Sequence, residues 1–149
     1  MNAMAPPRPT ELQGCRVRLA TGPTAPGEAR RQVQALIRAW DVPVDPDVAA
    51  LLTSELVTNA IRHEPGSTVT ISIACSRGEL RVDVDDTSRR WPVLVDASAE
   101  AEAGRGLMLV SSLSSQWGFY PTPAGKAVYF ALAFRPYLDE EDDRGLRRG

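Results

Sequence analysis

The sequence has few of the residues that build metal cages or disulfide frameworks. Its 149 residues include two cysteines, one histidine and a single lysine, Lys126. No grouping of His, Cys and carboxylates has the spacing of a structural zinc site. Cys15 and Cys75 occur in strand-like segments, where a reducing compartment favours buried apolar fillers over a disulfide. Neither a metal cage nor a disulfide framework is therefore expected to hold the fold together.

Long hydrophobic runs and excess charge of one sign are also missing. No apolar run reaches the roughly 20 residues that cross a bilayer, and residues 1–10 lack the pattern of a secretory signal. The 17 basic and 19 acidic side chains give a net charge of −2, which provides little attraction for a polyphosphate backbone. We therefore expect a cytoplasmic protein that contacts neither membrane nor nucleic acid directly.

The length indicates one domain with flanking segments. Residues 1–13 hold three prolines without periodicity, which is typical of a flexible lead. Residues 136–149 combine an acidic run, Asp139–Asp143, with three arginines, which is typical of a solvated tail. Residues 14–135 carry the periodic patterns, so the folded domain is expected there.

Apolar periodicity predicts an α+β fold. The chain alternates at strand spacing in some segments and repeats at helical spacing in others, and Asp45 precedes Pro46 as a helix N-cap would. Helices grouped together and strands paired as hairpins indicate a two-layer sandwich. The predicted elements are a strand at 15–20, helices from 28 to before 43 and at 48–63, strands at 68–75 and 80–84, a helix spanning 107–117, and final strands that include 128–134.

Four short polar or glycine-containing segments, called islands below, interrupt this apolar pattern. Glu55 and Asn59 are four residues apart and project from one helical face. Asp85-Asp86 ends an alternating strand, and Gly104-Arg105-Gly106 is expected to open a helix whose free amides favour phosphate. Gly125-Lys126 is expected just before the last strand. Each island alone is a weak indication, because helix faces and turns commonly carry such residues.

The four islands taken in order resemble a known family. The segments Glu55-Leu-Val-Thr-Asn59-Ala-Ile-Arg-His63, Val82-Asp-Val-Asp-Asp86, Gly104-Arg-Gly106 and Gly125-Lys126 are similar to motifs of the Bergerat-type (GHKL) ATP-binding domain. Within that superfamily the chain most resembles the small bacterial anti-sigma-factor serine/threonine kinases of the RsbW/SpoIIAB type. The likeness covers residues 15–134 or so. It implies a histidine-kinase-like ATPase fold, with a mixed, mostly antiparallel sheet covered on one face by helices.

The resemblance also implies roles for particular residues. Asn59 matches the asparagine that holds Mg²⁺ beside the ATP phosphates, and amide oxygens are ligands that Mg²⁺ accepts. Glu55 matches the catalytic acid that takes the proton of the attacking hydroxyl. Asp86 matches the aspartate that accepts a hydrogen bond from the adenine amine. ATP and Mg²⁺ are therefore the implied cofactors.

The remaining positions match the nucleotide-binding loops of the family. Glycines in such loops let backbone amides approach phosphates closely. Ser88 and Arg90 stand where the family usually has glycines after its adenine-reading aspartate, which puts the affinity for ATP in question. The expected nucleotide contacts beyond Asn59 and Asp86 are Ser88, Gly104, Arg105, Gly106, Leu107, Gly125 and Lys126.

Two functions follow from the resemblance and stay open at this point. The first is a Mg²⁺-ATP-dependent serine/threonine kinase that binds a sigma factor and phosphorylates an anti-sigma-factor antagonist, thereby regulating transcription. The second is a non-catalytic module that senses nucleotide or holds a partner through the same pocket. A homodimer is compatible with either function.

Overall fold

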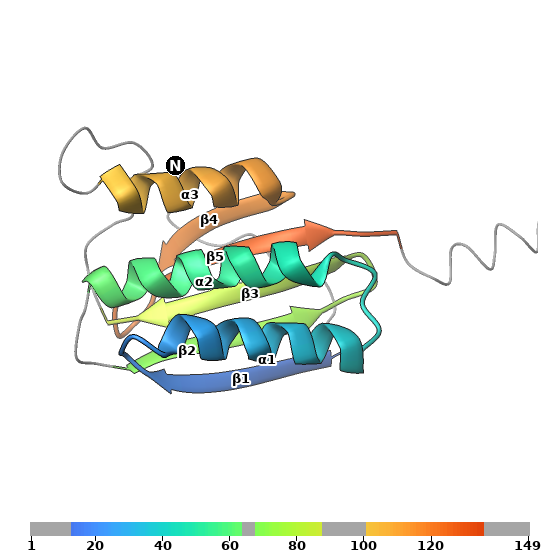
Figure 1. Ribbon diagram of the computed structural model, residues 1–149, viewed down its shortest axis with the longest axis horizontal. Helices are drawn as coiled ribbons and strands as arrows, with labels where there is room; N and C mark the ends of the chain where they lie inside the picture. Colours follow the sequence, from blue (N-terminus) through green and yellow to red (C-terminus); the bar gives the residue numbers. More distant parts are fainter. Residues whose placement is uncertain (1–12, 64–67, 88–100, 136–149) are drawn as a thin grey trace, which may run out of the picture.

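The computed structural model describes residues 13–63, 68–87 and 101–135. Three helices pack on one face of a five-stranded sheet, so the domain has two layers (Figure 1). Along the chain the elements are β1 (Gln13–Ala20), α1 (Ala25–Ala39), α2 (Pro46–His63), β2 (Thr68–Cys75), β3 (Glu79–Asp86), α3 (Ala101–Leu113), β4 (Gln116–Pro121) and β5 (Lys126–Ala133). No helix in these described residues is both long enough and apolar enough to cross a bilayer.

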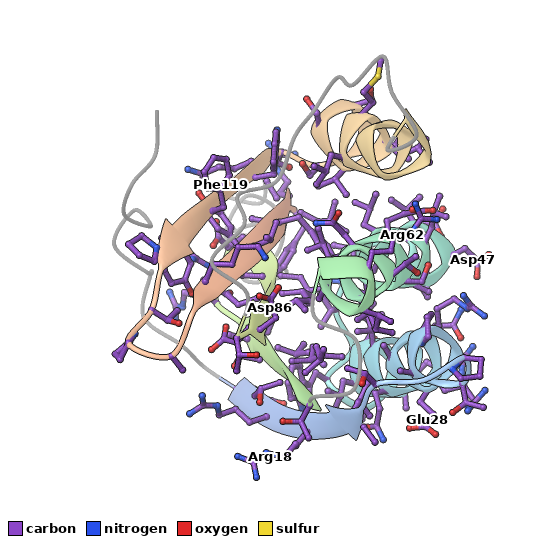
Figure 2. All side chains as sticks on the ribbon, turned by 90° about the vertical axis from the view of Figure 1, so that its left-hand side faces the viewer. Arg18, Glu28, Asp47, Arg62, Asp86 and Phe119 are labelled. Atoms are coloured by element: carbon purple, nitrogen blue, oxygen red, sulfur yellow. The ribbon has the colours of Figure 1, made fainter. Side chains whose placement is uncertain are left out.

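The strands lie in the order β1-β2-β3-β5-β4, and every neighbouring pair is antiparallel. The last strand in the sequence therefore lies between β3 and β4, and the polar start of β5 adjoins the polar end of β3. Helices α1 and α2 lie side by side over the sheet, while α3 contacts α2 and β4 (Figures 1 and 2). The predicted α+β two-layer sandwich is confirmed.

The start of α2 agrees with the predicted N-cap. The backbone amide of Asp47 donates to Oδ1 of Asp45 at 2.9 Å, and the amide of Ala49 donates to the Asp45 carbonyl at 3.1 Å. Pro46 takes the first helical position, where its missing N–H removes no intrahelical bond. This cap fixes where α2 begins, and so places Glu55 and Asn59 on its later turns.

The predicted start of α1 and the predicted end of α3 were wrong. Helix α1 begins at Ala25, before the Pro26-Gly27 pair that was expected to precede it, because a proline in the first turn costs no hydrogen bond. Helix α3 ends at Leu113, and Trp117 belongs to β4. The four-residue spacing of these two apolar side chains imitates a helix, but the amide of Ser115 already donates to Ala131 of β5 at 2.9 Å.

Alternation along the strands builds the core between the sheet and the helices. In β3 and β5 the even-numbered apolar residues face the helices and are almost fully buried. Burial of this kind contributes roughly 25 cal/mol per Å² of apolar surface, which is the main stabilising term of the domain. These residues are Leu80, Val82, Val84, Val128, Phe130 and Leu132, together with Leu52 and Leu56 from α2.

The outer face of the sheet carries a buried ion pair. Arg81 donates from Nε to Oδ1 of Asp83 at 2.9 Å and from Nη2 to Oδ2 at 3.1 Å. The Tyr120 hydroxyl donates to Asp83 at 2.5 Å, and the guanidinium lies 4.0 Å from the centre of the Tyr129 ring. Both charged residues are at most 3% exposed, so the polar face of β3 and β5 is packed and not simply solvated.

We predict that Asp83→Ala lowers the free energy of unfolding by about 3–5 kcal/mol, since it leaves the buried Arg81 charge without its carboxylate. Urea unfolding followed by circular dichroism measures this change. The double variant Arg81→Met, Asp83→Leu should recover most of the lost stability, because it buries no unpaired charge. A double variant as unstable as the single one would contradict this reasoning.

Candidate functional site

The predicted site residues that the structure describes come from elements that meet at one end of the molecule. The C-terminal end of α2, the end of β3, the start of β5 and the first turns of α3 all lie at the left-hand end in Figure 1. Figure 2 faces this end and shows Asp86 between the sheet and the end of α2 that carries Arg62. Helix α2 contacts both β3 and β5. Residues that are distant in the sequence are thus brought to a common region.

Asn59 is buried in α2 and carries an unpaired polar atom. Asn59 is 5% exposed, and its side-chain oxygen Oδ1 has no hydrogen-bond partner. A buried carbonyl oxygen without a partner costs roughly 1–3 kcal/mol. Such a group in a native fold either lowers the stability of the protein or marks a site where a ligand supplies the missing interaction.

Glu55 is half-buried one helical turn before Asn59 and faces α3. A Cβ atom built on Gly106 would lie 2.6 Å from Oε2 of Glu55, well inside contact distance. Glycine at position 106 therefore leaves the space that the carboxylate occupies. This contact joins the predicted catalytic acid to the helix that contains the predicted phosphate-binding glycines.

Asp86 and Lys126 form an ion pair at the same end. The Lys126 ammonium donates to Oδ1 of Asp86 at 3.0 Å and to Oδ2 at 3.1 Å. Both side chains are 1% exposed, and the two residues are direct partners in the β3–β5 register. The carboxylate that was expected to accept a bond from a nucleotide thus already accepts bonds from this chain's own lysine.

Gly125 is required by close backbone packing just before this pair. A Cβ atom at position 125 would lie 2.3 Å from the Asp86 carbonyl oxygen and 2.7 Å from the backbone carbons of Thr87. These neighbours are main-chain atoms, which cannot rotate away as a side chain can. Gly125 therefore lets the β4–β5 turn approach the end of β3.

The other predicted positions have varied surroundings. Gly104 and Gly106 lie inside α3, which begins at Ala101, so the expectation that they precede the helix was wrong. Arg105 lies in the same helix, and Ser88 falls outside the described residues. Leu107 is 1% exposed and packs in the hydrophobic core. The Leu107 side chain is thus part of the core and is not available to a ligand.

Sequence reasoning missed the partnership between Asp86 and Lys126, although a pattern indicated it. Asp86 continues the even-numbered series of Val82 and Val84, while Lys126 begins that of Val128 and Phe130. Since alternate residues of a strand point to the same face, both charged side chains had to point toward the helices. Two opposite charges at the ends of two apolar stripes are a detectable sign of such a pair.

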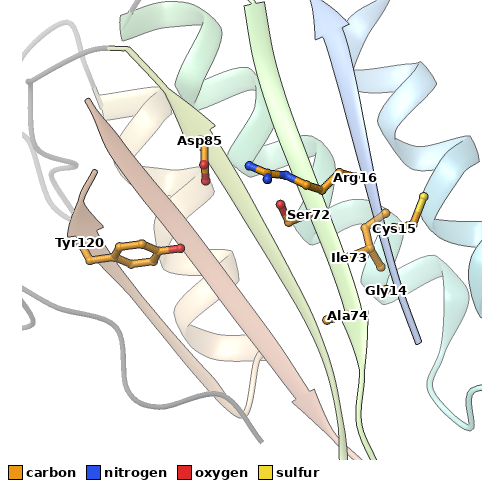
Figure 3. A pocket seen from close by; sticks show the side chains of 8 residues that line it. All are labelled: Gly14, Cys15, Arg16, Ser72, Ile73, Ala74, Asp85 and Tyr120. Carbon is orange, nitrogen blue, oxygen red and sulfur yellow. The ribbon is translucent and has the colours of Figure 1, made fainter. Parts of the chain in front are cut away.

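A pocket of about 610 Å³ lies on the opposite face of the sheet from the helices (Figure 3). Its polar side chains include Arg16, Ser72, Asp85 and Tyr120, contributed by four strands. None of the predicted nucleotide-binding residues lines it. This outer pocket is therefore separate from the candidate site, which lies between the sheet and the helices.

Comparison with known proteins agrees with the geometry. A family model of the histidine kinase-like ATPase domain matches residues 19–132. The chain belongs to the histidine kinase-like ATPase family. Its antiparallel sheet with three helices is consistent with that fold, and membership implies an ATP-binding regulatory module that usually works with Mg²⁺. No curated protein matches the chain.

In this histidine kinase-like ATPase, the predicted metal ligand Asn59 is available to Mg²⁺, whereas the predicted adenine-binding residue Asp86 is not readily available to the base. The unpaired amide oxygen of Asn59 is the hard donor that Mg²⁺ accepts. No cluster of three or more His, Cys, Asp or Glu side chains among the described residues could hold a metal ion, so Mg²⁺ would need phosphate and water as further ligands. Asp86, by contrast, is engaged by Lys126.

The two glycines of the site give opposite predictions. Gly125→Ala is expected to lower the free energy of unfolding by about 1–3 kcal/mol, because its Cβ would overlap main-chain atoms. Gly106→Ala should leave stability unchanged or raise it by about 0.5–1 kcal/mol, since alanine favours the helix and the flexible Glu55 side chain can move. Thermal unfolding of both variants tests this. Equal destabilisation by the two substitutions would contradict it.

Proposed function

We propose that this chain is a Mg²⁺-ATP-dependent serine/threonine kinase whose substrate is an anti-sigma-factor antagonist and whose binding partner is a sigma factor. The observation that carries the proposal is the unpaired, buried amide oxygen of Asn59, one helical turn beyond the Glu55 carboxylate and at the end where α3 begins. Family membership adds the expectation that this end receives ATP.

Asn59 is proposed to hold Mg²⁺ beside the phosphates. Its oxygen is held in place by a helix whose neighbouring residues Leu56 and Ala60 are almost fully buried. The oxygen therefore needs little reorganisation on binding, while the cost of leaving it unpaired is removed when it meets a cation. Bound Mg²⁺ neutralises charge on the phosphates, which is the chemistry it supplies in phosphoryl transfer.

Glu55 is proposed as the catalytic residue. A carboxylate would orient a serine or threonine hydroxyl and accept its proton as that oxygen attacks the γ-phosphorus of ATP. The bond from this phosphorus to the bridging oxygen would break, and ADP would leave. Glu55 is half-buried, so it is shielded in part and still within reach of a substrate. Its place beside Gly106 holds it next to the segment proposed to approach the phosphates.

The proposed partners are proteins and not nucleic acid. The resemblance to anti-sigma-factor kinases supports a sigma factor and its antagonist, and the net charge of −2 argues against direct binding to DNA. A phosphate added to a serine of the antagonist would bring about two negative charges to its docking surface. Phosphorylation would thereby weaken the antagonist's contact and leave the sigma factor bound to this chain.

One observation favours the second function, a non-catalytic module that senses nucleotide or holds a partner, and it favours the partner-binding form. Asp86 is paired with Lys126 and both side chains are buried. A site whose base-reading carboxylate is already engaged binds nucleotide less readily than one whose carboxylate is available. The two functions differ in whether phosphate is transferred, so they are separated by a transfer assay.

Asn59→Ala is expected to abolish the Mg²⁺ dependence of ATP binding. The same substitution should leave the stability of the free protein unchanged or raise it by up to about 1 kcal/mol, since it removes a buried unpaired oxygen and improves helix propensity. Calorimetric titration with ATP, with and without Mg²⁺, together with thermal unfolding, measures both effects. Gln34→Ala removes an amide from α1 and serves as the matched control. Unaltered Mg²⁺-dependent binding in Asn59→Ala would rule out the assigned role.

Glu55→Gln is expected to reduce phosphate transfer to the antagonist by roughly 10²–10⁴-fold, the usual contribution of a positioned general base. Binding of Mg²⁺-ATP should change little, because the amide keeps the shape of the carboxyl group. Radiolabelled ATP with candidate antagonist proteins provides the assay, and Glu28→Gln on α1 is the control. Nucleotide binding without any transfer by the unsubstituted protein would favour the sensing module.

A further inference from the structure

We propose that Lys126 competes with the base of the nucleotide for Asp86, and that this residue therefore sets the affinity and base preference of the site. The inference rests on the proposed function, because it assumes that Asp86 is the carboxylate facing the base. It assigns to Lys126 a specificity role that arises from the ion pair between β3 and β5.

Both oxygens of the Asp86 carboxylate already accept a hydrogen bond within this chain. Lys126 lies directly across from Asp86 in the register, and its ammonium contacts both carboxylate oxygens at 3.0 and 3.1 Å. Both side chains continue the apolar faces of their strands and point toward the helices. The ammonium therefore lies on the side of Asp86 from which a ligand between sheet and helices would approach.

An ammonium and an exocyclic amine offer the carboxylate the same kind of contact, an N–H donor. The ammonium is charged, so its bond to the carboxylate is the stronger of the two. Because each side chain of the pair is 1% exposed, water contributes little to loosening it. A base that presents an amine to Asp86 must displace Lys126, and the binding free energy is reduced by the cost of that displacement.

This competition predicts an unusual sign for a substitution in a nucleotide site. Removing a cation near a polyphosphate normally weakens binding. Here Lys126→Met removes the ammonium that contacts both oxygens of the buried Asp86 carboxylate, and the loss of such a buried counterion is destabilising. An amine of adenine would remove that penalty, so ATP should bind more tightly to the variant. Inosine triphosphate has a carbonyl oxygen in place of the amine, and at that position it can only accept, so it does not replace the amine as a donor to the carboxylate.

The experiment is calorimetric titration of the full chain with ATP and with inosine triphosphate in the presence of Mg²⁺. Lys126→Met should bind ATP roughly tenfold or more tightly than the unsubstituted protein, with no gain for inosine triphosphate. Lys126→Arg keeps a charged donor and should stay near the original affinity. Lys126→Gln keeps a neutral donor that preserves the fold, and should give an intermediate gain for ATP alone.

Arg81→Met provides the matched control, because it breaks the other buried ion pair of β3 on the outer face; its affinity for ATP should equal that of the unsubstituted protein. The double variant Lys126→Met, Asp86→Asn should lose the gain. Equal or weaker ATP binding by Lys126→Met, or equal gains for both nucleotides, would overturn the competition while leaving the ATP site intact. Absence of binding in the unsubstituted protein and in every variant would instead overturn the proposed function, and this inference with it.

Discussion

The alignment of β3 against β5 decides where the polar side chains of both strands lie. Asp86 is opposite Lys126, Val84 is opposite Val128, and Asp83 is opposite Tyr129. Because side chains alternate between faces, a slip of one residue in β3 would turn Asp83 toward the helices and Asp86 toward the outer face. The apolar stripe of each strand prevents this slip, since it would expose valines and bury charge. The burial of the apolar residues thus fixes the register of β3 against β5, and this register fixes the positions of the polar side chains.

The same strand pair carries two buried ion pairs on opposite faces, and their surroundings differ. Arg81 and Asp83 are supported by the Tyr120 hydroxyl and the Tyr129 ring, although the buried Tyr129 hydroxyl itself has no hydrogen-bond partner. Lys126 and Asp86 lie instead where α2, α3 and the strand ends meet. Buried ion pairs seldom stabilise a fold more than apolar residues of similar volume. This second pair lies at the proposed nucleotide site, and the role proposed for it concerns the ligand and not stability.

Local patterns predicted the elements well where the residues themselves determine the structure. Asp45 and Pro46 defined the start of α2, and the four-residue spacing placed Glu55 and Asn59 one turn apart on it. The start of α3 could not be predicted in this way, because Gly104 and Gly106 imitate a helix opening although the helix begins earlier. The contact between Glu55 and Gly106 depends on how two helices pack, which no local pattern encodes. The ion pair of Asp86 and Lys126 needed both the face of each strand and their register.

The two halves of the site differ in how completely their polar groups are satisfied. Asn59 bears the cost of an unpaired oxygen, so the free protein is less stable there than it would be with an apolar residue. Under the proposed function a cation would recover that cost on binding. Asp86 is satisfied internally, so a ligand gains from it only what remains after Lys126 is displaced. In the proposed site, contacts at the metal and phosphates would thus favour binding, while the contact at the base would oppose it. On this reasoning the triphosphate and its cation supply most of the affinity, and Lys126 determines how much the base adds.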